Sequence, residues 1–350
     1  MSPAVSPRRK RLPAAVGGLA VVAVVAVVAV VAAGPGPAGA AADGHGPVVV
    51  PVTTEHLGHG ADQVSYVVTH ISVAGGRSIP VQLDTGSSGL DVFSSAVGPH
   101  TRSTGHDVSI SYVGSTLSGV LATGSVTVGG LSTPSTTTFI AFSKTKNPAV
   151  AKWFADEGVD GILGVGMGAG GTGNPVWYSP LLQLPSPYWQ GFTLRVAARG
   201  DGSLTIGPVT HLAGATALAM QPGTTVTAYP GGVPDYQKDF VACWSVAGGT
   251  PGCGNTDMDL GAPGPLFGPG ALPGATTSDD GAVVSPGTAI TATTPTGTRL
   301  WSYTSSVTDR LTRTELVAQG HTEFNTGIGW FFDHTVAYDV AQGQFLVAPA

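Results

Sequence analysis

Charged residues are scarce in this chain of 350 residues. Asp, Glu, Lys and Arg make up 10% of it, and 15 basic residues stand against 21 acidic ones, which gives a formal net charge of −6. Proteins that bind nucleic acids depend on Lys and Arg to neutralise phosphates. A surface so poor in basic residues therefore argues against a nucleic-acid partner.

Cysteine is nearly absent as well, since Cys243 and Cys253 are the whole thiol inventory. Their spacing fits neither a C-x-x-C redox motif nor a zinc cluster, so no metal site is expected from them. In an oxidising compartment two cysteines so close in sequence are expected to form a disulfide. Closing this short loop would stabilise the fold by about 3 kcal/mol.

The long hydrophobic run of the chain lies at its N-terminus. Arg8 to Arg11 form a basic cluster, Ala14 to Ala33 are uncharged and mostly apolar, and Ala38-Gly39-Ala40 offers a cleavage site. Residues 1–42 are thus interpreted as a signal peptide or signal anchor, which predicts a secreted protein, or a membrane-anchored one if the segment is not cleaved. Loss of this leader leaves 11 basic residues against 21 acidic ones, a net charge of −10.

Helical periodicity is weak, and only two segments, residues 149–157 and 301–316, are predicted to be helices. Short β-rich runs punctuated by Gly, Pro, Ser and Thr dominate instead, which predicts an all-β fold. About 300 residues after the leader exceed what one core usually serves, so two lobes are expected. We place them at residues 43–210 and 211–350, with the boundary near Pro208 to Gly214.

The stretch from Asp84 to Gly89, Asp-Thr-Gly-Ser-Ser-Gly, follows directly on the apolar run Ile79 to Leu83. It places a carboxylate on a tight turn that leaves a strand. Gly86 allows close backbone approach, and the hydroxyls of Thr85 and Ser87 can hold a carboxylate by hydrogen bonds. These residue types predict a catalytic Asp84 supported by its three neighbours.

Further segments follow in an order that resembles the pepsin family (A1) of aspartic proteases. Tyr112 to Gly119 is similar to that family's flap hairpin, Val159 to Gly164 to its Asp-Gly-Ile-Leu-Gly segment, and Gly327 to Asp339 to the matching part of its second lobe. The resemblance implies a bilobal pepsin-like acid protease fold with a cleft between two β lobes. It also implies that Tyr112 and Gly114 belong to a flap that contacts substrate.

The second catalytic motif of that family does not appear intact. Its best match is Ala282 to Ile290, where Ser285 stands in place of the aspartate and Pro286 in place of the threonine, followed by Gly287 and Thr288 in supporting positions. An aspartic protease needs two carboxylates, one ionised to activate water and one protonated to donate to the scissile carbonyl. A serine at the second position predicts impaired or lost peptidase activity.

Two other aspartates bear on this expectation. Asp259 has a glycine at the right offset and is the surrogate candidate for the second acid, although its neighbours lack hydroxyls and its surroundings read as loop. Asp91 stands where many family members carry a tryptophan that hydrogen-bonds the flap tyrosine, which puts the anchoring of Tyr112 in doubt.

Two other patterns carry no function. Gly166 to Gly171 matches G-x-G-x-x-G, but no helix is predicted after it, so a nucleotide site is not expected. Glu55, His56 and His59 lack a fourth ligand and a helix to hold them. No metal and no cofactor are therefore expected.

The sequence thus predicts a secreted, monomeric, pepsin-like protein with one intact catalytic aspartate, Asp84, whose cleft binds an extended peptide, protein or glycan without efficient cleavage. The alternative is an active aspartic endopeptidase in which Asp259 or another acid completes the pair. A missing general acid would cost about 10²–10⁴ in rate.

Overall fold

The computed structural model describes residues 46–112, 115–170, 176–224, 229–278, 281–317 and 323–350. The expected leader, residues 1–42, and the flap residue Gly114 lie outside these ranges. None of the helices in the described part of the chain has the length and hydropathy that crossing a bilayer requires.

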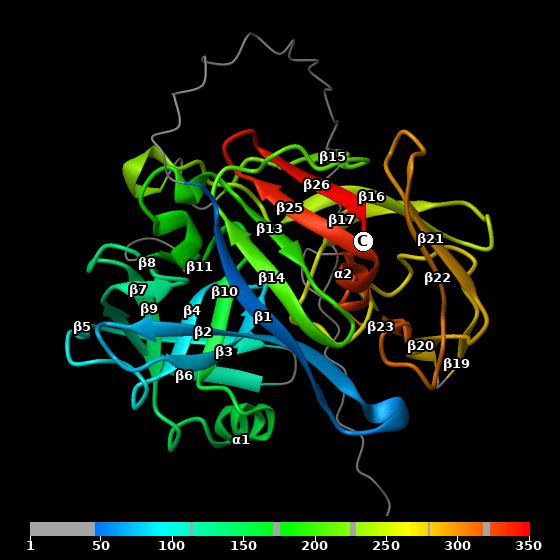
Figure 1. Cartoon of the computed structure of the whole chain (residues 1–350). Helices are drawn as coiled ribbons and strands as arrows, with labels where there is room; N and C mark the ends of the chain where they lie inside the picture. The colour runs from blue at the N-terminus through cyan, green and yellow to red at the C-terminus, as the bar shows by residue number, and fades with distance from the viewer. Residues whose placement is uncertain (1–45, 113–114, 171–175, 225–228, 279–280, 318–322) are drawn as a thin grey trace, which may run out of the picture. The chain divides into compact units, whose positions relative to one another are not determined.

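Strands are the main regular structure of the described chain, and they form two large sheets (Figure 1). The first sheet has 15 strands. They are β1 (Val48–Leu57), β2 (Val64–Val73), β3 (Ile79–Asp84), β4 (Ser88–Phe93), β5 (Arg102–Tyr112), β6 (Ser115–Thr123), β7 (Val126–Val128), β8 (Leu131–Ser132), β9 (Thr138–Phe142), β10 (Gly161–Val165), β13 (Phe192–Arg195), β14 (Gly200–Ile206), β15 (Thr216–Ala219), β25 (His334–Asp339) and β26 (Gln344–Pro349).

The second sheet has nine strands and lies wholly in the later part of the chain. They are β16 (Asp239–Val246), β17 (Gly252–Asp257), β18 (Leu266–Phe267), β19 (Thr277–Ser278), β20 (Val283–Val284), β21 (Ala289–Thr293), β22 (Arg299–Thr304), β23 (Glu315–Leu316) and β24 (Phe324–Asn325). A small separate ladder pairs β11 (Ala169–Gly170) with β12 (Trp177–Tyr178).

Each sheet has its own cluster of buried aromatic rings. Under the first sheet the ring of Phe93 lies 4.8 Å from that of Phe142 and 5.4 Å from that of Phe154. In the second, the ring of Trp244 lies 4.8 Å from that of Phe267 and 5.6 Å from that of Phe324. The predicted all-β fold with two lobes is confirmed.

Strands from both sides of residue 210 share the first sheet. In its strand order, β15, β26 and β25 lie beside β13 and β14, and β25 pairs with β13 in antiparallel fashion. The expected lobe boundary near Pro208 to Gly214 therefore falls in the connection from β14 to β15, both of which belong to one continuous sheet.

Helices are few, as the weak helical periodicity predicts. The helix expected at residues 149–157 is confirmed as α1 (Pro148–Glu157), which begins with a proline in its first turn and ends at Gly158 in the left-handed conformation. The helix expected at residues 301–316 is wrong, because this segment contains β22 and β23. The ring of Trp301 lies 4.4 Å from that of Tyr303 two residues along β22, and Trp301 also packs on Trp244. The described residues also contain a short α-helix, α2 (Gly329–Asp333), and four 3-10 turns.

Candidate active site

Asp84 lies at the end of β3, which is held on one side by β10. The two strands run parallel, with Asp84 opposite Gly164, while β4 pairs with the other edge of β10 in antiparallel fashion. The chain therefore leaves β3 at Asp84, turns through Thr85 to Ser87, and returns as β4 on the far side of β10.

Asp259 lies in a second turn of the same construction. Strand β17 runs parallel to β24, with Asp257 opposite Asn325, and β18 pairs with the other edge of β24 in antiparallel fashion. Asp259 follows two residues after β17 ends, within the connection to β18. The two sheets therefore present two turns with matching strand arrangements, each carrying an Asp-x-Gly sequence.

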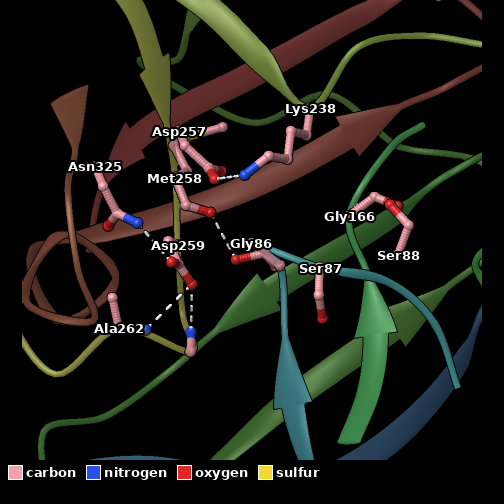
Figure 2. A network of polar contacts seen from close by, with 12 residues as sticks. Gly86, Ser87, Ser88, Gly166, Lys238, Asp257, Met258, Asp259, Ala262 and Asn325 are labelled. Atoms are coloured by element: carbon pink, nitrogen blue, oxygen red, sulfur yellow. Dashed lines mark hydrogen bonds and ion pairs between the residues drawn. The ribbon is translucent and has the colours of Figure 1, made fainter. Parts of the chain in front are cut away.

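The two turns meet through their glycines. A Cβ added to Gly86 would lie 2.3 Å from Cγ of Asp259, and one added to Gly261 would lie 2.5 Å from Oδ1 of Asp84. Each glycine thus faces the carboxyl group of the opposite turn, at a distance that admits no side chain. Figure 2 shows Asp259 and Gly86 close together between the two turns. We call Asp84 and Asp259 the aspartate pair.

Ser285 is not the residue that faces Asp84, and this part of the sequence interpretation is corrected. Ser285 follows β20 and its backbone N–H donates to the carbonyl oxygen of Thr276. Gly287, with φ of 83°, is exposed, and Thr288 begins the return into β21. The segment resembles the expected motif in letters but forms a turn within the second sheet, whereas Asp259 takes the place opposite Asp84.

Backbone and side-chain donors orient both carboxyl groups. Oδ1 of Asp84 accepts from the N–H of Gly86 at 2.8 Å, and Oδ2 accepts from the hydroxyl of Ser87 at 2.6 Å. Oδ1 of Asp259 accepts from the N–H groups of Gly261 and Ala262, at 2.8 and 3.1 Å. Ala262 has no hydroxyl to match that of Ser87.

A side chain from β24 supplies the missing donor. Nδ2 of Asn325 donates to Oδ2 of Asp259 at 2.6 Å (Figure 2). Oδ1 of Asn325 in turn accepts from the N–H of Gly327 at 3.0 Å, which fixes the orientation of the amide. Both oxygens of Asp259 are therefore hydrogen-bonded although the hydroxyl expected after its glycine is missing.

Thr85 joins the two turns directly. Its hydroxyl donates to the carbonyl oxygen of Met258 at 2.6 Å and accepts from the N–H of Leu260 at 2.8 Å. Leu260 occupies the corresponding position of the second turn and is fully buried. The hydrogen-bonded connection between the two turns therefore depends on the hydroxyl of Thr85, because the corresponding residue of the second turn, Leu260, has an apolar side chain.

Burial and mutual repulsion favour a proton on the aspartate pair. Desolvation raises the pKa of Asp84, the negative charge of Asp259 raises it further, and the hydrogen bonds from Ser87 and Gly86 oppose the rise; together they bring it to about 7. Two carboxyl groups so close together cannot both ionise easily, which favours a proton on Asp84. Such a pair can hold one ionised and one protonated group over a wide acidic range.

A partly buried ion pair lies beside Asp259. The ammonium of Lys238 contacts Oδ2 of Asp257, which ends β17 and is 1% exposed (Figure 2). Burial lowers the pKa of Lys238, but attraction to Asp257 and then to Asp259 outweighs this and raises it above its usual value. The lysine therefore stays charged and places a positive charge near the aspartate pair.

Tyr112 is anchored by Asp91, the residue that stands where the sequence resemblance expects a tryptophan. It ends β5, whose hairpin partner is β6, and its hydroxyl donates a short hydrogen bond to Oδ2 of Asp91 on β4. The ring also contacts Trp153 of α1 edge to face, with ring centres 6.1 Å apart. The carboxylate of Asp91 thus takes over the anchoring role for which the sequence resemblance expects a tryptophan.

A cavity of about 890 Å³ lies next to the aspartate pair. Residues of the first turn and the hairpin, including Gly86, Ser87 and Tyr112, line one part of it, and Lys238 and Asn255 line another. Its volume lies within the usual range of ligand-binding pockets, roughly 300–1,000 Å³. In the described part of the chain no cluster of metal-ligating side chains occurs.

Sequence reasoning missed Asn325 and Lys238, and it placed Ser285 where Asp259 belongs. One signal could have found the second turn, because Asp259-Leu260-Gly261 precedes Asn325 to Gly329 as Asp84-Thr85-Gly86 precedes Asp160 to Gly164. In both pairs an Asp-x-Gly turn is followed by a Gly-Ile-containing segment. No sequence signal of this kind points to Lys238, because its contact with Asp257 depends on how β17 packs in the folded chain.

The chain matches the model of a known protein family. The model of the PE-PGRS C-terminal aspartyl peptidase-like domain matches residues 49–343. No curated protein matches the chain. The matched range includes both Asp-x-Gly turns, the hairpin that carries Tyr112, and the two cysteines, which form a disulfide.

Proposed function

The chain belongs to the family of PE-PGRS C-terminal aspartyl peptidase-like domains, and from this premise we propose that it is an active aspartic endopeptidase. Asp84 and Asp259 are the catalytic pair in this proposal. The observation that carries it is the reciprocal approach of each carboxyl group to the glycine of the opposite turn. This proposal replaces the expectation of an impaired peptidase, because that expectation assigned the second catalytic position to Ser285.

In the proposed mechanism the pair binds a water molecule between the two carboxyl groups. The ionised carboxylate accepts a proton from the water as it attacks the scissile carbonyl carbon, while the protonated carboxyl donates its proton to the carbonyl oxygen. The resulting tetrahedral intermediate collapses with proton transfer to the leaving nitrogen. The raised pKa of Asp84 supports the presence of that proton at acidic to neutral pH.

The surrounding residues support rigid positioning of the pair. Thr85 and Asn325 hold the two turns and one carboxyl group in fixed geometry, which lowers the reorganisation needed during reaction. Tyr112, anchored through Asp91, lines the cavity beside Gly86 and is the proposed flap residue that covers a bound peptide. Similarity to pepsin in particular, rather than to aspartic peptidases in general, is part of this proposal.

We also propose that the protein acts outside the cytoplasm, as a monomer. The basic and apolar character of residues 1–42 and the disulfide between Cys243 and Cys253 support export to an oxidising compartment. A single chain supplies both aspartates, so the site needs no second copy. The same leader, if retained, would tether the protein to a membrane.

The decisive experiment is cleavage of a diverse peptide library by the full chain between pH 3 and pH 8, with and without pepstatin. Asp84→Asn and Asp259→Asn serve as test variants, and Ser285→Ala is the matched control. We expect pepstatin-sensitive cleavage that both aspartate variants lose and that Ser285→Ala keeps. Absence of cleavage by folded protein, or cleavage that survives Asp259→Asn, would overturn the proposal.

A further inference from the structure

Asp91 has a carboxylate oxygen without a hydrogen-bond partner among the residues that the structure describes. The residue lies on β4, is 3% exposed, and lines the cavity beside the aspartate pair. Its Oδ2 accepts the hydrogen bond from Tyr112, but Oδ1 is buried and has no hydrogen-bond partner among the described residues. A buried polar atom without a partner costs free energy, so such an atom at a cavity is a candidate for contact with a ligand.

The other charged groups around the cavity favour a cation there. Asp91, Asp235 and Asp239 line it, whereas Lys238 is its basic residue among those described, and this lysine is already paired with Asp257. The acidic surplus of the cavity agrees with the net charge of the whole chain, −6. Clefts lined by one sign of charge concentrate ligands of the opposite sign.

Apolar side chains of the cavity suit the stem of a long basic residue. Ile110, Met167 and Trp177 line the cavity together with Asp91. Lysine and arginine bury their aliphatic stems along apolar surface while the charged end finds a partner. A donor at the end of such a stem suits a carboxylate as deeply buried as that of Asp91.

We infer that Asp91 is a specificity-determining residue, whose carboxylate receives the charged end of a lysine or arginine side chain of the peptide substrate. The inference rests on the proposed peptidase function and names its substrate class, peptides with a basic residue near the scissile bond. The substrate cation contacts Oδ1, so Tyr112 keeps its hydrogen bond to Oδ2. Asp91 thereby couples occupation of this subsite to the position of the flap residue.

The competing role for Asp91 is anchoring of Tyr112 alone. Both roles predict a loss of activity when the side chain of Asp91 is removed, so its removal does not distinguish anchoring of Tyr112 from binding of a substrate cation. Asp91→Asn separates them, because an asparagine still offers a carbonyl oxygen to the hydroxyl of Tyr112 but carries no charge for a cation. Tyr112→Phe is the complementary control, since it removes the anchor and keeps the charge.

The test uses pairs of peptides that differ at one position, lysine in one and norleucine in the other, with the position moved along an otherwise constant sequence. Burial raises the pKa of Asp91 to about 7, against the opposing effect of Tyr112, so the comparison is made at pH 8 as well as at pH 5. At one position we expect kcat/KM to favour lysine on the order of tenfold at pH 8, because a charge-assisted hydrogen bond is replaced by none. Asp91→Asn should bring this ratio to about one, while Tyr112→Phe preserves it.

Binding of the same peptides to the Asp259→Asn form, followed by fluorescence anisotropy, separates this inference from the proposed function. Preferred binding of lysine peptides without any cleavage by the natural protein would support the subsite and refute the peptidase. Cleavage with equal kcat/KM for both members of every pair would refute the subsite and leave the peptidase. A lysine preference that Asp91→Asn retains also overturns the role given to Asp91, and the wild-type comparison remains decisive if that variant fails to fold.

Discussion

The hydroxyl of Thr85 donates to the carbonyl oxygen of Met258, 173 residues later in the chain, and accepts from the N–H of the residue two further on, Leu260. Both contacts are buried, and they tie the turn of Asp84 to the turn of Asp259. Leu260 occupies the corresponding position of the second turn, and it has no hydroxyl that could make reciprocal hydrogen bonds to the first turn. The geometry of the aspartate pair therefore depends heavily on one oxygen atom.

Replacing Thr85 with valine, which has nearly the same shape, should destabilise the fold and lower activity together. The change leaves the carbonyl of Met258 and the N–H of Leu260 buried without a partner, at about 1–3 kcal/mol for each group. We expect the free energy of unfolding in urea to fall by about 2–4 kcal/mol and kcat to fall with it. Thr101→Val is the matched control, because the hydroxyl of Thr101 donates within its own turn, to the carbonyl oxygen of Gly98. A loss no larger than that of the control would refute the bridging role.

Asp259 and Ser285 compete for the second catalytic position, and two substitutions decide between them. Asp259→Asn should lower kcat by about 10²–10⁴, the range for loss of a general acid or base. The new amide keeps a carbonyl oxygen for the N–H groups of Gly261 and Ala262 but no longer accepts from Asn325, so a moderate loss of stability should accompany the loss of kcat. Ser285→Ala should change kcat less than twofold. Steady-state kinetics on one peptide suffice, and a large loss in Ser285→Ala would reinstate the sequence-based assignment.

How far the sequence predicts the site depends on how local each contact is. The turn at Asp84 is recognisable because Thr85 and Ser87 follow it directly, and the strands around it have strong β patterns. Asp259 is obscured because its supporting groups come from elsewhere, a hydroxyl from Thr85 in the first turn and an amide from Asn325. When the supporting groups come from distant parts of the chain, the residues that flank the aspartate in sequence do not reveal them.

The same reason explains two errors beyond Asp259. Ser285 and its neighbours have the expected spacing of glycine and hydroxyl residues, but spacing alone does not tell whether a turn faces the opposite lobe. In residues 301–316 apolar side chains recur at a helix-like interval, although Trp301 is buried against Trp244 in a β ladder. Tertiary packing of aromatic residues overrides weak local preference there.

The contact between Tyr112 and Asp91 should matter more for activity than for stability. Tyr112→Phe removes the donor to Oδ2 of Asp91, and we expect a stability loss of about 1–3 kcal/mol with a clear fall in kcat/KM. Tyr66→Phe is the control, since the hydroxyl of Tyr66 also makes a buried bond, to the carbonyl of Glu157, but does not line the cavity. It should lose similar stability and keep its kcat/KM.

A double-mutant cycle tests whether these two residues act through each other. If Asp91→Ala and Tyr112→Phe each remove the same interaction, the double variant should lose less than the sum of the two single losses, by about 0.5–3 kcal/mol in either stability or transition-state binding. Strict additivity would show that the hydrogen bond contributes nothing measurable.

The disulfide between Cys243 and Cys253 should stabilise the hairpin that leads to Asp259. The two cysteines lie opposite each other on β16 and β17, separated by 10 residues in sequence. Replacing both with serine should lower the free energy of unfolding by about 3 kcal/mol. Addition of reductant should destabilise the natural protein by a similar amount and leave the double variant unchanged. An equal response of both proteins to reductant would contradict this.

Stability should fall as the pH rises from 4 to 8, because several buried carboxyl groups favour their neutral forms. Burial raises the pKa of Asp91 to about 7 from an ordinary value near 3.8, and burial likewise raises that of Glu157 to about 7. The folded protein thus binds these protons more tightly than the unfolded chain. Their contribution is complete below about pH 4 and is lost as the pH rises to 7.

Thermal unfolding at pH 4, 5, 6, 7 and 8 measures this dependence, and Asp91→Asn isolates the part due to one residue. A full three-unit shift would correspond to about 4 kcal/mol, an upper limit for one group. The variant has no carboxyl group at position 91 to ionise, so its melting temperature should fall less steeply between pH 4 and pH 7 than that of the natural protein. The converse pattern, a melting temperature that rises with pH, would mean that the carboxyl groups are ionised and well paired in the folded state. Equal slopes in the two proteins would mean that Asp91 is already ionised at pH 4, with Tyr112 and its surroundings compensating for its burial.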